Sequence, residues 1–501
     1  MNENEKISNG VKKLLIFVVF VAGYLIMSLE LLGFRLLAPY FGNSIYVWGS
    51  LIGLILAALS VGYYFGGWLV DEYPQEKILP WLFGGAAVFL LAILFLYNPI
   101  LGYLSSLSVI WGSLLSTFLI FGVPMVALAA VSPVIIKILA DQEKTGRSAG
   151  SVYAWATLGS LSGTFLTAFI LIPYFGSRLT LYSCFFLALI VLVTLFLKDE
   201  IKNFFILGLV FFISLFSLQR PALPSNVILE TESAYNQIRL VDMPKYVLMT
   251  LNSQRYNLSQ SAYVKNGTLF NISLIDLFNV GPIITPVKNL LILGMSGGAS
   301  VRQFQQYFPE VKIDAVEIDP KVIQIAAERF GVKANENLNI YEADARPFLT
   351  KSQKEYDMIE VDLFQGSPYT PFYTLTQEFF KSTSTNLSQE GVLMMNIYAP
   401  QGQEILAPAL ATISSVFPSV YTIPINDNFV VLATKSKTDL ETIKNKIKAA
   451  QKSISPDLIL ATNYTSDLIQ EYQPDKKTPV FTDDWAPVET LTYQMLLGLK
   501  L

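Results

Sequence analysis

Residues 290–298 read Leu-Leu-Ile-Leu-Gly-Met-Ser-Gly-Gly, a hydrophobic strand followed by a glycine-rich turn. A second apolar run at 314–317, Asp-Ala-Val-Glu, ends in an acid 23 residues after Gly294. This order is typical of an α/β nucleoside-binding domain, in which small residues let the backbone approach the ligand and the acid accepts hydrogen bonds from ribose hydroxyls. The pattern therefore predicts that this part of the chain binds a nucleoside cofactor.

Apolar runs alternate with segments of helical periodicity on both sides of this stretch. We expect strands near 289–294, 312–317, 338–342, 356–361, 391–397 and 428–433, and helices near 299–308, 321–330, 375–387 and 437–453. Such alternation predicts a Rossmann-like, doubly wound and mostly parallel α/β domain over residues 281–501. Short β-like runs with polar turns predict a small antiparallel β subdomain over residues 226–280.

The first 218 residues carry most of the apolar excess of a chain that is 52% hydrophobic and 15% charged. Seven apolar windows, most of them long enough to cross about 30 Å of hydrocarbon, are expected there. They are Leu14–Leu37, Val47–Val70, Leu79–Tyr97, Leu107–Ala130, Val152–Ile172, Leu179–Leu197 and Phe204–Leu218. The last is short and also fits an interfacial or re-entrant segment. We therefore expect a helical membrane domain over 1–218 and a proline-bearing linker at 219–225.

Composition excludes several kinds of site. The chain has no histidine, which removes the commonest general base and transition-metal ligand, so we expect no metal site. Catalysis must then come from carboxylates, amides, tyrosines or the cofactor. A net charge of −4 with no dense block of lysine and arginine argues against nucleic acid as a partner.

Two further acids follow predicted strands. Asp344 is placed either to accept from an adenine amino group or to cap the helix that follows it. Asp362 ends the run that begins at Tyr356 and precedes a loop with glycine and proline, so it is placed to meet a ligand in the crevice of the sheet. The alternative for Asp362 is an ordinary loop carboxylate.

Two charges, Glu30 and Arg35, lie inside or at the end of the first apolar window. Charges at membrane depth are costly, so we expect both to face the bundle interior or an interface and to pair with other helices. The alternative for Arg35 is that its side chain extends to the lipid headgroups.

Taken together, these pieces resemble the membrane-fused members of the spermidine synthase family, the polyamine aminopropyltransferase-like proteins. The matching stretches are Glu232–Asn236, Leu290–Gly298, Val316–Pro320, Glu342–Ala345, Tyr356–Asp362 and Phe481–Asp484, with Leu29-Glu30 and Arg35–Pro39 in the first apolar window. The resemblance extends over nearly the whole chain. It implies a transferase, and a homodimer as in related synthases.

The resemblance also implies a role for each matching residue. The donor would be S-adenosylmethionine or its decarboxylated form, bound by Gly294, Ser296, Gly298, Glu317, Ile318, Asp344 and Ala345. Glu317 would hold the ribose, Asp344 and Ala345 the adenine, and Asp362 would act on the attacking amine. The substrate would face Tyr235, Asn236, Gln365, Asp483 and Asp484.

Two departures concern the acceptor. The glycine turn of the synthases contains an aspartate where this chain has Gly297, and a second aspartate after the catalytic one is replaced by Gln365. A short diamine needs anionic partners at both ends, so we expect a different acceptor, an amine or other nucleophile supplied near the bilayer. A methyltransferase, and a non-enzymatic polyamine-binding or transport protein, remain alternatives.

Lysine and arginine near the apolar windows favour an amino terminus inside the cell, by nine residues to two. Seven spans would then place the nucleoside-binding domain outside, whereas sulfonium nucleosides are made in the cytosol. The sequence predicts a multi-pass protein of the cell (inner) membrane and leaves the side of the soluble domain open.

Overall fold

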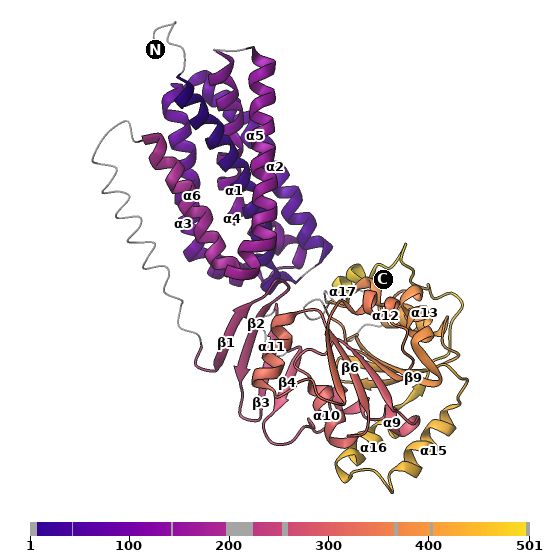
Figure 1. Ribbon diagram of the computed structural model, residues 1–501. Coiled ribbons are helices and arrows are strands. Elements are labelled where there is room, and N and C mark those ends of the chain that lie inside the picture. Colours follow the sequence, from indigo (N-terminus) through magenta and orange to yellow (C-terminus); the bar gives the residue numbers. More distant parts are fainter. Residues whose placement is uncertain are drawn as a thin grey trace. The chain divides into compact units, whose positions relative to one another are not determined.

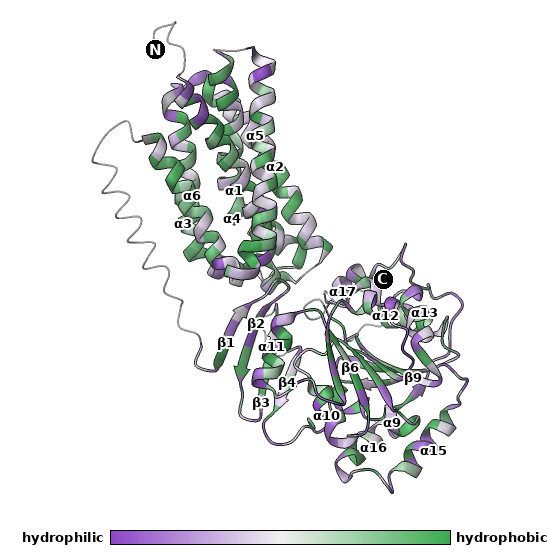
Figure 2. Ribbon diagram, in the orientation of Figure 1, coloured by the Kyte–Doolittle hydropathy of each residue, from purple (hydrophilic) through white to green (hydrophobic). Residues whose placement is uncertain are grey.

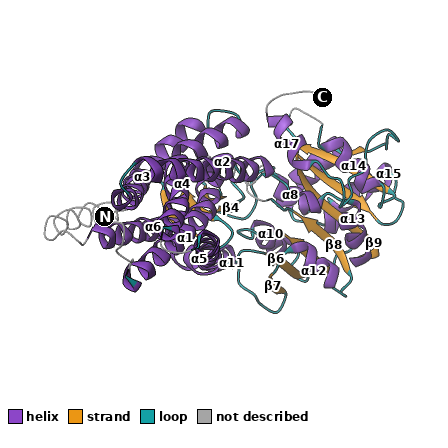
Figure 3. Ribbon diagram, turned by 90° about the horizontal axis from the view of Figure 1, so that it is seen from above, coloured by secondary structure: helices purple, strands orange, loops and turns teal. Residues whose placement is uncertain are grey.

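The computed structural model describes residues 8–42, 44–141, 144–196, 224–252, 259–364, 369–400 and 404–496. The chain divides into two compact units, Met1–Leu223 and Pro224–Leu501 (Figure 1). The described part of the first unit is helical, whereas the second unit combines strands and helices (Figure 3).

The first unit contains α1 (Asn9–Phe41), α2 (Ile45–Glu72), α3 (Gln75–Leu104), α4 (Val109–Ala140), α5 (Thr145–Leu166) and α6 (Ile172–Phe196), with a π-helical turn at Thr167–Leu171. Five stretches among the described residues are long and apolar enough to cross a membrane, and hydrophobic residues dominate them (Figure 2). The expected count of seven is not confirmed. The predicted window Val152–Ile172 and most of the window Leu179–Leu197 fall in one 51-residue stretch, Thr145–Leu195, and the window Phe204–Leu218 lies outside the described residues.

The long fifth stretch is broken at Gly176, where φ is 77° and ψ is 169°. A straight helix of this length would extend about 75 Å, more than twice the hydrocarbon thickness of a bilayer. Only glycine adopts such a positive φ without strain, so Gly176 is the point at which the chain changes direction.

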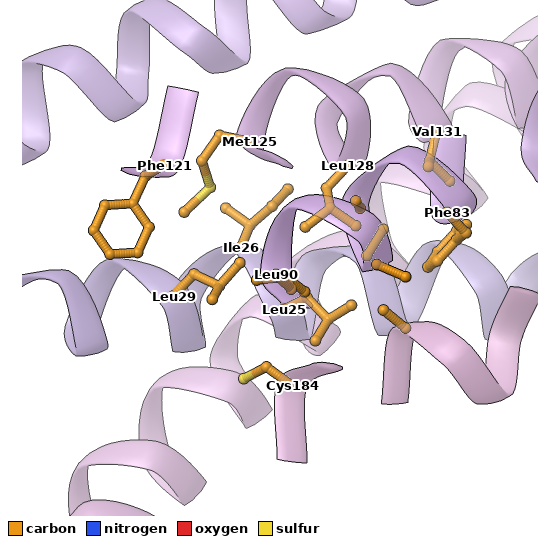
Figure 4. Packing of buried hydrophobic residues seen from close by; sticks show 14 of the residues in the cluster. Leu25, Ile26, Leu29, Phe83, Leu90, Phe121, Met125, Leu128, Val131 and Cys184 are labelled. Carbon is orange, nitrogen blue, oxygen red and sulfur yellow. The ribbon is translucent and has the colours of Figure 1, made fainter. Parts of the chain in front are cut away.

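Glycine sets the distance between helices in this unit. A Cβ atom added to Gly159 would lie 2.0 Å from the Phe20 carbonyl oxygen, and one added to Gly163 would lie 2.3 Å from that of Tyr24. The backbones of α5 and α1 therefore approach as closely as small residues permit, as in many membrane bundles. Side chains of α1, α3, α4 and α6 fill the core, as Figure 4 shows for Leu25, Leu90, Phe121 and Cys184 among others.

The predicted charges Glu30 and Arg35 both lie on α1 and are half-buried. Their expected pairing with other helices stays a prediction.

The second unit begins with a four-stranded antiparallel sheet in the order β1 (Val227–Glu232), β2 (Gln237–Asp242), β3 (Tyr246–Leu251) and β4 (Ser261–Val264). An eight-stranded sheet follows, in the order β12-β10-β11-β9-β8-β5-β6-β7. Its strands are β5 (Asn289–Leu293), β6 (Lys312–Glu317), β7 (Leu338–Glu342), β8 (Tyr356–Val361), β9 (Leu387–Tyr398), β10 (Ser419–Ile425), β11 (Asn428–Thr434) and β12 (Gln470–Glu471). Strands β5 to β9 are parallel, as expected, but β11, β10 and β12 add an antiparallel edge, so the sheet is mixed.

Helices cover both faces of the large sheet. They are α8 (Leu274–Phe278), α9 (Gly281–Ile284), α10 (Ala299–Tyr307), α11 (Pro320–Arg329), α12 (Ala345–Lys351), α13 (Gln377–Asn386), α14 (Leu406–Ser414), α15 (Leu440–Ala450), α16 (Ile459–Leu468) and α17 (Val488–Leu496), with 3-10 turns at Phe372–Thr374 and Pro456–Leu458. Alternate residues of β5 enter different cores, Leu290 and Ile292 on one face and Leu291 and Leu293 on the other, as the period of a strand requires. The first core includes α10, α11, α15, α16 and the small sheet, and the second includes α12, α13, α14 and α17.

The order of the parallel strands reverses at β5. From this strand the chain continues to β6 and β7 on one side, and β8 and β9 lie on the other. Ligands of open α/β sheets bind in the crevice outside the carboxyl ends of the strands at such a reversal. The glycine turn after β5 and Asp362 after β8 both lie at this point.

Candidate functional site

The glycine turn lies directly against the residue that follows β8. Gly294 and Gly298 have φ values of 92° and 74°, and Ser296 has 49°, so the turn uses left-handed conformations that glycine adopts easily. A Cβ atom added to Gly294 would lie 2.3 Å from the Asp362 carbonyl oxygen. The fold thus brings together two elements that the sequence placed in one site.

The Glu317 carboxylate is hydrogen-bonded to the backbone of the glycine turn. Its Oε2 accepts a hydrogen bond from the Ser296 backbone N–H at 2.8 Å, and its Oε1 accepts one from that of Asp319 at 3.1 Å. The side chain is only 8% exposed, so it is not a solvent-facing strand end. Burial raises the pKa of Glu317 to about 7, although the backbone hydrogen bonds oppose this rise. Each carboxylate oxygen has a second lone pair, which leaves capacity for the two hydroxyls of a ribose.

Asp319, which the sequence analysis did not single out, joins the small sheet to β6. Its Oδ2 accepts from the Ser233 hydroxyl at 2.6 Å and from the Asn236 side-chain amide at 2.7 Å, and its Oδ1 caps α11. The sequence could have indicated the capping role of Asp319, because an aspartate directly before a proline at a helix start is a common N-cap arrangement. Ile318 is half-buried between the two acids.

The two residues expected to face the substrate from the small sheet differ in their surroundings. Asn236 donates to Asp319, and its side-chain oxygen accepts from Asn252 at 2.7 Å, so both ends of its amide are already used within the protein. Tyr235 is 45% exposed. Tyr235 is therefore the more accessible of the two, whereas Asn236 is half-buried and held by Asp319 and Asn252.

The adenine side of the predicted site contains a helix cap and an ion pair. Asp344 caps α12 by accepting from the Arg346 backbone N–H at 3.0 Å, which is the capping alternative; its contact with adenine stays a prediction. Ala345 is buried behind it. Asp483 pairs with the Arg346 guanidinium and accepts from the Thr376 hydroxyl, and the arginine lowers the pKa of Asp483.

Asp362 is held by one side chain. Its Oδ1 accepts from the Asn396 Nδ2 at 2.9 Å, and burial raises the pKa of Asp362 to about 6 while this hydrogen bond opposes the rise. Asn396 lies on β9 and is 4% exposed, and its Oδ1 has no hydrogen-bond partner within the described part of the chain. Gln365, the next predicted substrate residue, lies outside the described residues.

A second acid, Glu360, lies two residues before Asp362 on β8 and was also missed. It is 1% exposed, and its Oε2 accepts from the Ser300 hydroxyl at 2.7 Å. Burial raises the pKa of Glu360 to about 8, and the charge of Asp362 adds to the rise. A glutamate inside a central strand was the available signal, because such residues are rarely buried without a reason.

The turn leaves no room for the acid that the synthases carry there. A Cβ atom added to Gly297 would lie 2.6 Å from the Phe330 ring and 2.8 Å from the Ser261 hydroxyl. Phe330 is itself fixed by stacking on Tyr263, with ring centroids 5.5 Å apart. Gly297 is therefore a packing requirement in this chain and not simply a lost aspartate.

The residues of the turn nevertheless fit a nucleoside. The Ser296 side-chain oxygen is buried and makes no hydrogen bond to any described residue, so it has capacity to bind a ligand group. Together with the free lone pairs of Glu317, it provides polar groups at the carboxyl ends of neighbouring strands.

Comparison with known proteins identifies the family. Residues 276–446 match the model of the spermine/spermidine synthase domain, and a polyamine aminopropyltransferase of Vibrio vulnificus is 30% identical over 222 residues, which is 43% of this chain and 72% of that protein. The chain belongs to the spermine/spermidine synthase family. Its relatives in this family are transferases, and the chain is an enzyme of that class.

Two other similarities differ in extent. Polyamine aminopropyltransferase 2 of Aquifex aeolicus is 23% identical over 466 residues, which is 88% of this chain and 91% of that protein, so the likeness includes the helical unit. A probable spermidine synthase from Corynebacterium glutamicum has a solved structure with 16% identity and a TM-score of 0.41, covering 53% of this chain and 97% of that one.

Proposed function

We propose that this family member is a membrane-embedded transferase that alkylates an amine or another nucleophile near the bilayer. The donor is a sulfonium nucleoside, either S-adenosylmethionine or its decarboxylated form. The observation that carries the proposal is the meeting of two acids at the reversal of the sheet. Glu317 is fixed beneath the glycine turn, and Asp362 follows the neighbouring strand in backbone contact with that turn.

The two acids suit different parts of one reaction. When bound, the sulfonium supplies a good leaving group, so a nitrogen–carbon bond forms as the carbon–sulfur bond breaks. Asp362 takes the proton that the attacking amine loses and passes it to water. A pKa raised to about 6 leaves Asp362 mostly ionised at neutral pH but close enough to that pH for efficient proton transfer. Asn396 fixes the direction of the carboxylate, which favours alignment of the nucleophile.

Exposed aromatic residues support membrane insertion of the helical unit. Trp48 and Trp68 of α2 are both exposed and are 20 residues apart, or about 30 Å along a helix. Trp81 and Tyr103 of α3 are exposed at a spacing of about 33 Å. Aromatic side chains at both borders of a hydrocarbon layer of about this thickness are typical of membrane proteins.

The product of the reaction tests the proposal. Detergent-solubilised protein would be supplied with each sulfonium nucleoside and a set of amines, and released nucleoside would be identified by mass spectrometry. We expect methylthioadenosine from the decarboxylated donor, and its release should depend on Asp362. Absence of nucleoside binding and of any thioether product with both donors would overturn the proposal.

Methyl transfer is the second candidate. It is favoured by the crowding at Gly297 and by the pairing of Asp483 with Arg346, which leave few acids to hold a dicationic diamine. The same assay separates the two reactions, because methyl transfer releases S-adenosylhomocysteine. Because few acids are left to hold a dicationic diamine, we also expect little or no spermidine from putrescine.

A further inference from the structure

Glu360 of β8 and Asp362, the first residue after it, lie on the same side of the sheet, because the backbone pairing with β5 continues to Asp362 and side chains two residues apart on a strand share a face. The register partners of Glu360 on this face are Ile292 of β5 and Met394 of β9, and Ser300 of α10 lies over it. Among these described neighbours only Asp362 is charged. The charge of Asp362 therefore acts on Glu360 with no other charged group among these neighbours.

A buried amide lies beside the same pair. Asn396 donates to Asp362, and its own side-chain oxygen is buried without a partner in the described residues. A buried acceptor with no donor is uncommon in a folded protein and indicates a group that arrives from outside. A ligand with hydrogen-bond donors, such as an ammonium group, would satisfy it.

We propose that Glu360 is a positioning residue for Asp362: the two side chains share one proton, and a cation that enters the site expels that proton to solvent. This inference rests on the proposed function, since it assumes a cationic ligand beside Asp362. The net charge of the two carboxyl groups would then become more negative when a cation binds. Glu360 would also supply an acid near the acceptor, where the turn has Gly297 and no room for an aspartate.

The physical reason is the cost of a buried charge on Glu360 beside a second, half-buried acid, Asp362. With no cation nearby, two ionised carboxylates would repel each other, and burial of Glu360 adds to the cost of its charge, so the pair retains one proton near neutral pH. Burial raises the pKa of Glu360 to about 8 and that of Asp362 to about 6, which places the proton mainly on Glu360. Because the groups interact, the two protons are lost in steps that belong to the pair. A nearby cation favours the ionised forms, and the shared proton is released.

Calorimetry measures this release without turnover. S-adenosylmethionine, a sulfonium, and S-adenosylhomocysteine, a neutral thioether, would each be titrated into the full-length protein at pH 7.5 in two buffers of different ionisation enthalpy. Protons released by ionisation of Glu317 on ribose binding are common to both ligands and cancel in the difference. We expect the sulfonium to release about half a proton more than the thioether, since a cation shifts a neighbouring acid by at least about one pKa unit.

Variants assign the proton. Glu360→Gln keeps the size of the side chain and its contact with Ser300, and we expect it to remove more than half of the difference while affinity for the thioether stays within twofold. Glu360→Asp should retain the difference. Glu355→Gln, an exposed glutamate just before β8, is the matched control and should behave as the parent protein.

The outcomes separate this inference from the proposed function. Binding of both ligands with equal proton release by the parent protein would overturn the inference alone, and so would an unchanged difference in Glu360→Gln. Failure of the parent protein to bind either nucleoside, or the decarboxylated donor, would overturn both.

Discussion

The two halves of the site are built differently. On the nucleoside side, Glu317 is held by backbone N–H groups of the turn and of the segment after β6. On the acceptor side, Asp362 and Glu360 are held by single side chains, Asn396 and Ser300. Backbone N–H donors are kept through most substitutions, whereas a contact made by one side chain is lost when that residue is substituted. The nucleoside half can therefore stay like that of the family while the acceptor half diverges.

Substitution of Asp362 separates the chemical step from nucleoside binding. Asp362→Asn should lower turnover at least about 100-fold, because the amide keeps the shape of the side chain but cannot take a proton. Affinity for the thioether nucleoside should change little, since Asp362 belongs to the other half. Steady-state rates and calorimetry on the same preparation check both points, with Asp427→Asn at an exposed turn as control. Near-normal turnover would make Asp362 a structural loop residue.

The next effect tests the nucleoside half. Glu317→Ala removes the acceptor of two backbone N–H groups and of the ribose hydroxyls. Loss of such charge-assisted hydrogen bonds costs about 1.5–3 kcal/mol, so nucleoside affinity should fall about 10-fold to 150-fold. Unchanged affinity by calorimetry would place the nucleoside elsewhere. Melting of the variant should be recorded alongside, because the turn itself loses support.

Gly297→Asp asks whether the acceptor half can simply regain the aspartate of the synthases. Its Cβ atom would meet Phe330 and Ser261 at distances that real side chains avoid. Overpacking of this kind costs about 1–3 kcal/mol, so we expect a lower melting temperature and no gain of activity with putrescine. Gly267 and Gly331 both have a positive φ, so an aspartate at either position would add backbone strain of its own. The parent protein is therefore the reference. A stable variant that makes spermidine would show that one residue separates the two acceptor classes.

The pH dependence of thioether binding follows from Glu317. An acid whose pKa is raised to about 7 is mostly protonated at pH 6 and mostly ionised at pH 8. Only the carboxylate accepts both ribose hydroxyls, so thioether affinity should rise by about tenfold between these values. Folding stability should change in the opposite direction, because the folded state retains the proton above the ordinary pKa and loses this advantage as pH rises. Affinity that falls over this range would contradict the assignment.

The sequence predicted the parts of the fold that have a strong period or a marked turn. Strands β5, β6 and β8 and the glycine turn were expected where they occur, because apolar runs and glycines are local signals. The antiparallel strand β10 was missed, since a half-polar strand with Pro424 at its end lacks a clear pattern. The break at Gly176 was missed for a different reason: a single positive φ inside an apolar run leaves no periodic trace.

The site was predictable in its residues but not in its contacts. Glu317 ends β6 and Asp362 follows β8, so both could be named from their positions in the sequence pattern. The roles of Asn396, Ser300 and Asp319 depend on which strands become neighbours, and β8 and β9 pair across a connection of 25 residues. Sequence position alone could not show that Asp483 would pair with Arg346.

The smallest effect concerns the two acids near the end of the chain. Asp484 is exposed, so Asp484→Asn should have the small effect of most exposed substitutions. We expect the Michaelis constants to change by less than about twofold and the melting temperature by less than about one degree. Asp483→Asn should instead lower stability, because it weakens contacts with Arg346 and Thr376 that tie α12 to this segment. If Asp484 instead binds a second ammonium group of the acceptor, Asp484→Asn would raise the Michaelis constant for a diamine several-fold. The Michaelis constant for a monoamine would stay unchanged. Amine saturation curves for both substitutions therefore decide whether the acceptor side ends at β8 and β9 or extends to this segment.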